Sequence, residues 1–484
     1  MSGRPSILRR MLGESAVYGL GGLANQALAI VLVPVYAREL GVESYGAVAI
    51  INTTFALTTM VITLALPQAF FRWYLKEAQS DRERADVLRT ALGLRLLVSI
   101  LGLLVFSALS LQLSVVLLGS ASDWPLIALI GPIVFLDSLN LVPMAFLRAQ
   151  RRPRPFAVIA FIRAVLGSVL IIVFVVVLRM GVLGVVLGSL GSAAVTTAVG
   201  YVVLAREGGL RIGVDWTRIR HMLAFSLPLV PAAVAGWTLN LSDRYIIQAF
   251  DGRAAVGLYS AGYVVGLAIN ALAIAPFTLA WGATYWEIAR QSDARQTIAR
   301  VLTGFTALAA FAALAISALA TDAFRILLTP AFEAGRFVTP FSAFGYVLYG
   351  IYTVVTTGLN LENQTRRVPV ITVAVAIVSV LLNLLLVPAI GYIGAGVSTL
   401  ASYALLAVVS GLVSQRHYPV PWELGRVGAL LGIAMGLAAA ALLGPDHVGW
   451  RLACLAAYPA VVLGLRIIPV GSLSALGALG RRRH

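Results

Sequence analysis

The sequence predicts an all-α polytopic membrane protein with about 14 transmembrane helices, arranged as two six-helix lobes and a C-terminal helix pair. Three observations predict this fold: the composition, a series of long apolar stretches, and an internal repeat. Of the 484 residues, 60% are hydrophobic and only 12% are charged, and the mean hydropathy is +0.92. A soluble protein could not bury so much apolar surface, so we expect the chain to lie in a bilayer.

Fourteen apolar stretches follow one another, each near the ~20 residues that a helix needs to cross the hydrocarbon core. Continuous stretches joined by short turns favour helices over the alternating segments of an outer-membrane barrel. The gaps are too short for a folded soluble domain, so no extramembrane catalytic domain is expected. The predicted spans are 16–37, 47–69, 91–111, 125–147, 156–178, 182–204, 222–241, 256–280, 301–320, 337–359, 369–388, 392–413, 427–444 and 450–468.

The net charge of +16 is distributed unevenly over the connecting segments. Of the 36 Lys and Arg residues, 26 lie in one alternating set of segments, 6 in the other, and four inside predicted spans. By the positive-inside rule, both termini are then cytoplasmic. We interpret the basic residues as orientation signals and not as a nucleic-acid footprint.

Residues for metal, disulfide or hydrolytic chemistry are absent from the sequence pattern. Cys454 is the only cysteine, and the four histidines are scattered without metal-ligand spacing. No Walker-A loop and no nucleophile elbow is present. We therefore expect no cofactor, no metal site and no enzyme activity, and no ATP-driven transport by this chain alone.

The first twelve spans repeat a six-span pattern about 210 residues apart. Gly41-x4-Gly46 recurs as Gly252-x4-Gly257 at an offset of 211. Three further matches in register are Arg89 and Gly93 with Arg300 and Gly304, 107–109 with 317–319, and Gly181-x2-Gly184 with Gly391-x2-Gly394. An even number of spans per repeat predicts lobes related by an axis along the membrane normal. The predicted divisions are 1–211 for the N-terminal lobe, 212–424 for the C-terminal lobe, and 425–484 for an extra helix pair with a basic tail.

Corresponding interruptions in the two halves indicate where such a transporter binds and bends. Proline kinks a helix, and clustered glycine weakens it or allows close packing. The first and seventh spans are therefore predicted to line a cavity and to act as gates, with plain close packing as the alternative. The gate or hinge candidates are Gly19, Gly21, Gly22, Pro228 and Pro231.

Three segments together resemble the polysaccharide-transport flippases of O-antigen and exopolysaccharide type. The segments are LGVESYG at 40–46, SDRYII at 242–247 with VGLYS at 256–260, and NLLLVP at 383–388 with GYIGAG at 391–396. The superfamily also includes multidrug/toxin extrusion carriers and the lipid II flippase. The resemblance implies movement of undecaprenyl-diphosphate-linked oligosaccharide across the bacterial plasma membrane by alternating access. It also implies contact with membrane lipids, a polysaccharide polymerase and other export proteins.

Such a cargo has a polar, anionic head that the protein must shelter from lipid. Sugar hydroxyls call for hydrogen-bonding side chains, and a diphosphate calls for the planar fork of arginine. Candidate cavity residues are Asn25, Gln26, Asn52, Arg95, Asp137, Asn140, Arg163 and Asn240. For the amides, helix-to-helix hydrogen bonds are the alternative role. Asp243 and Arg244 at the outer end of the seventh span are expected to form a helix-end or loop pairing, with substrate contact as the alternative.

Asp137 and Arg163 are predicted to meet inside the membrane. They lie about 15 Å and about 11 Å from the cytoplasmic ends of their spans at ~1.5 Å per residue. Charges at this depth usually face a cavity or a partner. A structural ion pair and a role in binding or proton coupling both remain open.

Two transport alternatives and one enzyme alternative stay open. The lipid II flippase presents arginines from its first, second and eighth helices, whereas spans two and eight contain none here. A cation-coupled small-molecule antiporter needs a deep acidic residue, and Asp137 is the only one inside a span. A membrane polymerase would carry a large outer loop, but the longest predicted here, 321–336, has 16 residues.

Overall fold

The computed structural model describes residues 32–207 and 210–467, and within these ranges the regular structure is entirely helical. Helix packing divides the chain into two compact units, Met1–Gly257 (unit 1) and Leu258–His484 (unit 2). The repeat boundary at residue 211 and the added hairpin from residue 425 remain predictions. The two compact units reflect which helices pack together, and this packing does not show where a sequence repeat begins or ends.

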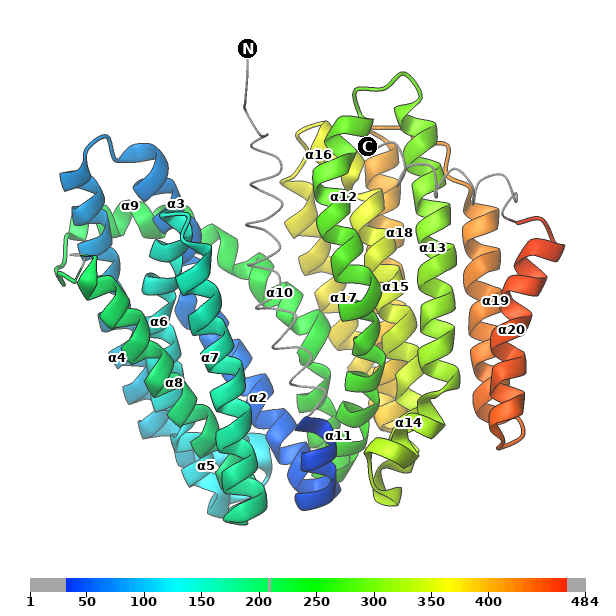
Figure 1. Ribbon diagram of the computed structural model, residues 1–484, viewed down its shortest axis with the longest axis horizontal. Coiled ribbons are helices and arrows are strands. Elements are labelled where there is room, and N and C mark those ends of the chain that lie inside the picture. The colour runs from blue at the N-terminus through cyan, green and yellow to red at the C-terminus, as the bar shows by residue number, and fades with distance from the viewer. Residues whose placement is uncertain (1–31, 208–209, 468–484) are drawn as a thin grey trace. The chain divides into compact units, whose positions relative to one another are not determined.

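Unit 1 is built around the helices α4, α6, α7 and α8, which run side by side (Figure 1). Its elements are α2 (Gly41–Thr63), α3 (Leu66–Arg72), η1 (Trp73–Glu77), α4 (Asp81–Leu118), η2 (Ala121–Asp123), α5 (Trp124–Ala128), α6 (Ile130–Ala149), α7 (Pro153–Ile172), η3 (Val173–Val177), α8 (Gly181–Arg206), α9 (Trp216–Ser226), η4 (Leu227–Leu229), α10 (Val230–Leu241) and the first part of α11 (Asp243–Ile269).

Unit 2 is built around α13, α15, α17 and α18, with the hairpin α19–α20 packed beside α13 (Figure 1). Besides the second part of α11, its elements are η5 (Asn270–Ile274), α12 (Ala275–Ile288), α13 (Ala294–Ala318), α14 (Ala320–Leu327), η6 (Pro330–Val338), α15 (Thr339–Val355), α16 (Thr357–Leu361), α17 (Arg367–Ile390), α18 (Tyr392–Gln415), α19 (Leu424–Leu443) and α20 (Val448–Gly464).

The predicted membrane spans correspond to helices throughout the described chain. Eleven helical segments are long and apolar enough to cross a membrane. One of them, Trp216–Ile288, contains both the seventh and the eighth predicted spans, and Val448–Gly464 is a shorter apolar helix at the fourteenth. Most of the first predicted span, 16–37, lies outside the described residues.

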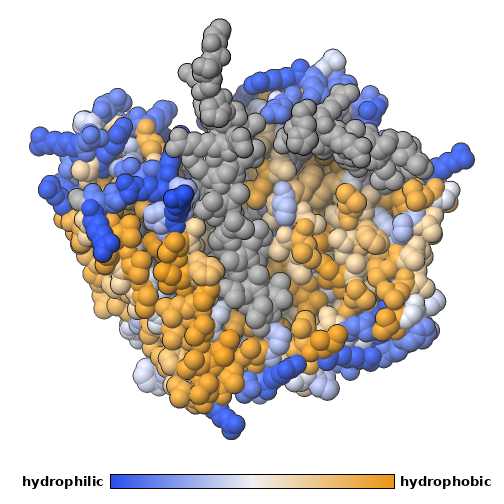
Figure 2. Space-filling view, viewed as in Figure 1, coloured by the Kyte–Doolittle hydropathy of each residue, from blue (hydrophilic) through white to orange (hydrophobic). Residues whose placement is uncertain are grey.

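Large apolar side chains cover the outside of both units. Leu101 and Val116 on α4 are 62% and 74% exposed, and Leu385 on α17 is 69% exposed. On the face shown in Figure 2, each unit is orange along its middle and blue toward its ends. Such surfaces are stable only against lipid, so the chain is a multi-pass membrane protein.

The backbone repeats the glycine pattern of the sequence. Gly41 and Gly252 have φ angles of +73° and +79°, and Gly181 and Gly391 have φ angles of +58° and +64°. Left-handed φ angles favour glycine because it has no Cβ. Each pair stands at corresponding places in the predicted six-span pattern, so the angles support the internal repeat, which stays a prediction.

The repeated glycines pack against each other where α2 crosses α11 within unit 1. A Cβ on Gly46 would lie 2.0 Å from the carbonyl oxygen of Arg253, and a Cβ on Gly257 would lie 2.1 Å from that of Val42. The contact is reciprocal, because residues 42 and 46 correspond to 253 and 257 in the repeat. We call these four residues the glycine crossing. Nearby, the hydroxyls of Thr54 and Tyr245 are 2.8 Å apart and join the same two helices.

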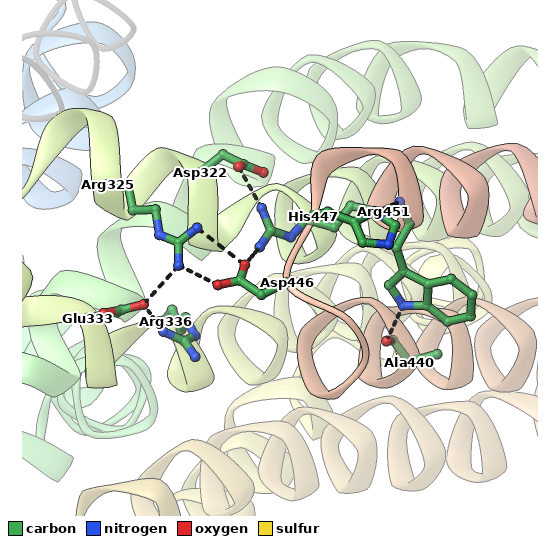
Figure 3. Close-up of polar contacts among 9 residues, drawn as sticks. Asp322, Arg325, Glu333, Arg336, Ala440, Asp446, His447 and Arg451 are labelled. Atoms are coloured by element: carbon green, nitrogen blue, oxygen red, sulfur yellow. Dashed lines mark hydrogen bonds and ion pairs between the residues drawn. The ribbon is translucent and has the colours of Figure 1, made fainter.

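Buried Arg451 attaches the added hairpin to the rest of unit 2 (Figure 3). Its side chain is 3% exposed, and its guanidinium donates to Asp322 at 2.5 Å and to Asp446 at the tip between α19 and α20. Trp450 donates from its indole nitrogen to the carbonyl of Ala440 at 2.8 Å and closes the tip. The hairpin is therefore pinned by charge pairs between α14 and α20.

A second arginine extends this charge cluster onto η6. Arg325 donates to both carboxylate oxygens of Asp446, at 2.5 and 3.2 Å, and lies 3.6 Å from Glu333. Glu333 also pairs with Arg336. Three acids and three arginines thus alternate across the hairpin tip, α14 and η6.

Substituting the glycine crossing should destabilise the protein. Gly46→Ala and Gly257→Ala each place a methyl group into a backbone carbonyl, and such overpacking costs about 1–3 kcal/mol. We expect a lower thermal midpoint for each variant in detergent, and a double variant that loses less than the sum because both changes open the same contact. Gly236→Ala on α10 is the control, since its added Cβ meets nothing within 4 Å. Equal midpoints for Gly46→Ala and Gly236→Ala would show that α2 and α11 do not cross as described.

The pairing of Asp446 should make its stabilising effect depend on pH. The hydrogen bonds from Arg325 hold the pKa of the Asp446 carboxyl below its usual value of 3.8. A lowered native pKa means that the stabilisation is complete above the unfolded pKa and is lost as the pH falls through the native pKa. The difference in thermal midpoint between wild type and Asp446→Asn should therefore persist from pH 7 to about pH 5 and shrink below about pH 4. Asp251→Asn, at an exposed acid, is the control and should show no such trend. A wild-type advantage over Asp446→Asn that is as large at pH 3 as at pH 7 would contradict the pairing.

Candidate functional site

Arg95 closes a helix break in the interior of unit 1. Leu64 and Ala65, between α2 and α3, have left-handed φ angles of 51° and 49°. The buried Arg95 guanidinium donates to the carbonyl of Ile62 at 2.7 Å and to that of Ser138 on α6 at 2.8 Å. Backbone groups freed inside a membrane must find partners in the protein. Arg95 therefore satisfies the end of α2, and a role in substrate contact stays a prediction.

Side chains from α8 likewise hydrogen-bond to backbone carbonyls of α6. Pro143 has no N–H, so the carbonyl of Leu139 lacks its helical donor. The Tyr201 hydroxyl lies 3.4 Å from that carbonyl, and the Thr197 hydroxyl donates to the carbonyl of Leu136 at 2.9 Å. These bonds hold the middle of α6 against α8 and fix the position of Asp137 between them.

Asp137 and Arg163 meet in the membrane, as the sequence predicts. The Arg163 guanidinium donates to the Asp137 carboxylate at 2.7 Å, to the hydroxyl of Ser192 at 2.8 Å and to the carbonyl of Ser189 at 3.0 Å. Their side chains remain 25% exposed for Arg163 and 17% for Asp137. The three helices α6, α7 and α8 thus form one polar cluster. Its two charges are paired with each other, and both side chains remain partly exposed. We call Asp137, Arg163, Ser189 and Ser192 the charged cluster.

The predicted amide residues within the described chain occupy three different settings. Asn52 on α2 is exposed. Asn140 is half-buried on α6, with its side-chain oxygen facing Gly200 of α8. Asn240 donates to the carbonyl of Gly236 in its own helix at 2.8 Å. Their place in a cavity stays a prediction.

Five predicted residues cannot be placed. Asn25, Gln26, Gly19, Gly21 and Gly22 lie outside the described residues.

The seventh span is interrupted at its two prolines. Pro228 lies in the short 3-10 segment η4, and Pro231 lies in the first turn of α10, so the span consists of α9, η4 and α10. Asp243 and Arg244 follow at the start of α11, where the guanidinium donates to the neighbouring carboxylate at 2.8 Å and both side chains are buried. The interruption and the pairing are confirmed, and the gating role stays a prediction.

Unit 2 contains a polar cluster of another kind that the sequence reasoning missed. Tyr346, Tyr349 and Tyr352 follow one face of α15, and Tyr403 of α18 packs against the first two. The hydroxyls of Tyr263 and Tyr346 are 3.1 Å apart. The i, i+3, i+6 spacing on α15 was the available signal. We call these five residues the tyrosine cluster.

The two units differ in the chemistry of their membrane-spanning helices. Unit 1 holds Arg95, Asp137 and Arg163 within its spans, whereas α15 and α18 of unit 2 contain no charged residue. Tyrosine, serine and threonine hydroxyls provide most of the polar groups on these two helices, as where the hydroxyl of Thr399 on α18 lies 3.3 Å from that of Tyr259. Among the described residues, no group of three or more potential ligands could hold a metal ion.

Comparisons with known proteins give a family and a fold. Residues 12–281, more than half of the chain, match the family described as "Polysaccharide biosynthesis protein". A search of curated proteins found no match.

Two solved structures show the fold. The first is described as "Lipid II flippase MurJ, inward closed conformation"; its TM-score is 0.73 at 13% identity, covering 93% of this chain and 97% of that one. The second is an inward-facing multidrug resistance MATE family transporter of the MOP superfamily, with a TM-score of 0.66 at 16% identity, covering 84% of this chain and 95% of that one. Both are described as transport proteins and not as enzymes. The chain therefore belongs to the polysaccharide biosynthesis protein family, and its fold is that of membrane flippases and transporters.

Proposed function

We propose that the protein moves undecaprenyl-diphosphate-linked oligosaccharide from the cytoplasmic to the outer face of a bacterial plasma membrane, with both termini in the cytoplasm. The family match over residues 12–281 carries the polysaccharide part of the proposal. The flippase part is supported by the fold and by the incompletely buried charged cluster within the spans of unit 1.

The chemistry of the charged cluster suits the diphosphate of such a headgroup. In this cluster, Arg163 offers a guanidinium in the membrane, and its pairing with Asp137 lowers the cost of keeping that charge there when no substrate is bound. A diphosphate would compete with the carboxylate for the same planar donors.

Alternating access requires helices that move against each other at low cost. The glycine crossing brings two backbones together without interlocking side chains, so a change of angle there displaces no large group. Pro228 in η4 and Pro231 in the first turn of α10 supply a second flexible point in the chain. We propose both as hinge elements of the transport cycle.

A cation-coupled small-molecule antiporter is the second candidate. It is favoured by the position of Asp137, the one acid in the middle of a described span of unit 1, and by the similarity in fold to a multidrug transporter. A lipid II flippase is the third, favoured by the similarity in fold to that protein. The three differ in cargo and in the need for an ion gradient, which makes them separable.

Reconstitution in liposomes tests the proposal together with the role of the charged cluster. Wild type should transfer a short-chain polyprenyl-diphosphate oligosaccharide between leaflets, measured by the accessibility of its sugars to an external glycosidase. Asp137→Asn and Arg163→Gln each leave one charge unpaired and should each lower stability by roughly 1–3 kcal/mol. The double variant Asp137→Asn/Arg163→Gln should regain stability, because no unpaired charge remains, and yet fail to transfer the lipid.

Ser168→Ala is the matched control on α7, since its hydroxyl bonds only to Ala164 of the same helix at 2.9 Å. A double variant that transfers the lipid at the wild-type rate would show that the charged cluster is only structural. Absence of transfer by wild type, together with efflux of an organic cation driven by a proton gradient, would replace the flippase with the antiporter. Transfer of lipid II in preference to the oligosaccharide lipid would favour the third candidate.

A further inference from the structure

Residues 210–216, which lead into α9, are fixed along the side of α4. The backbone N–H of Gly213 donates to the carbonyl of Arg89 at 3.3 Å. A Cβ on Gly93 would lie 2.1 Å from the carbonyl oxygen of Gly213, so the two backbones touch. We call residues 210–216 the strap. Its position on α4 is set by direct backbone contact.

The start of α9 holds the other end of the strap. Asp215 caps α9 by accepting from the backbone N–H of Arg218 at 3.1 Å, and the Arg218 guanidinium returns to the same carboxylate at 3.0 Å. Arg218 also lies 3.8 Å from Asp86 of α4. The strap is therefore anchored at both Gly213 and Asp215, so the side that faces away from α4 has a defined position.

The exposed part of the strap is largely apolar. The backbone of Gly213 lies against Gly93 of α4, and a Cβ on Gly93 would lie 3.3 Å from a methyl group of Val214. Leu210, Ile212, Val214 and Trp216 are 45%, 57%, 43% and 70% exposed. Four of the seven residues of the strap are thus large, apolar and exposed. Exposure of these apolar side chains to water is unfavourable.

The strap lies at the depth of a membrane surface. Gly93 is about 18 Å from the start of α4 at ~1.5 Å per residue, and α4 is about 57 Å long by the same rise. The hydrocarbon core is about 30 Å thick. Before Arg89 the helix is rich in charge, and beyond Gly93 it is apolar apart from Arg95. Gly213 therefore contacts α4 where its apolar part begins, a level at which tryptophan is enriched in membrane proteins.

Basic residues accompany these apolar residues. Arg211 in the strap and Arg220 in α9 are exposed, and neither forms an ion pair within the described chain. Arginine close to a membrane surface is attracted to anionic headgroups. We propose that the strap is an interfacial lipid-binding element: its apolar side chains insert among the acyl chains beside α4, and Arg211 and Arg220 bind the headgroups of anionic phospholipids.

Site-specific fluorescence quenching tests this proposal on the full chain. The single cysteine, Cys454, is replaced by alanine, and a bimane probe is attached to Val214→Cys or, as control, to Gln79→Cys in the exposed loop just before α4. The proteins are placed in vesicles of phosphatidylglycerol and phosphatidylcholine, with a nitroxide high on the acyl chain of one lipid or the other. Aqueous iodide is the second quencher, and gel filtration with a thermal midpoint confirms folding.

We expect strong quenching of the Val214 probe by nitroxide lipid and weak quenching by iodide, with the reverse at Gln79. Phosphatidylglycerol should quench more than phosphatidylcholine, since each arginine contributes about a fivefold preference for the anionic lipid. Arg211→Gln/Arg220→Gln should bring the two lipids to equal effect. Iodide quenching at Val214, or shielding from both quenchers by protein, would overturn the insertion. Equal quenching by both lipids in the protein with Arg211 and Arg220 intact would overturn the headgroup binding.

Discussion

The need to satisfy every backbone polar group inside the membrane governs unit 1. Backbone carbonyls are freed where α2 ends at Leu64 and Ala65 and where α6 contains Pro143. In lipid each freed carbonyl would cost several kcal/mol, a cost far above that of a lost bond in water. Arg95 and Tyr201 take up these carbonyls. Deep polar residues of unit 1 are thus held by structural bonds that position the helices.

The charged cluster differs from Arg95 in one respect that matters for function. Arg95 is enclosed, with 1% of its surface exposed, whereas Arg163 and Asp137 keep about a fifth of their side-chain surface open. An arginine that is already ion-paired can exchange its carboxylate partner for another anion without passing through a state in which its charge is unpaired. This exchange is the physical basis of the proposed headgroup binding, and it explains why an acid and a base stand together where an arginine alone would be too costly.

The sequence predicted the helices well, because they depend on local patterns. Apolar length located the spans, and the glycine pairs at an offset of 211 returned in the structure as matching backbone angles at Gly41 and Gly252. Helical rise was enough to predict that Asp137 and Arg163 meet. The reciprocal packing of Gly46 and Gly257 was not predictable, because a repeat in sequence does not say which copies touch. The role of Arg95 was missed, although Pro67 in the first turn of α3, two residues after Ala65, was an available signal for the break at the end of α2.

The strap and the tyrosine cluster are features that were missed because the sequence was searched mainly for charged and amide residues within the spans. Residues 210–216 look like an ordinary loop in the sequence, and only the structure shows that Gly213 lies against α4 while four large apolar residues of this segment stay exposed. The tyrosines on α15 look like core until their packing with Tyr403 is known. In both cases the meaning of a residue depends on which side of its element is occupied. Spatial neighbours settle this, and local sequence does not.

The central claim is that Arg163 recognises the diphosphate of a lipid-linked saccharide. Its most direct test compares leaflet-to-leaflet transfer of two lipids with the same polyprenyl chain and the same sugars, one joined by diphosphate and the other by an uncharged ether. The account predicts transfer of the diphosphate lipid alone by wild type, and loss of that preference in Arg163→Gln. Equal transfer of both lipids by wild type would contradict it.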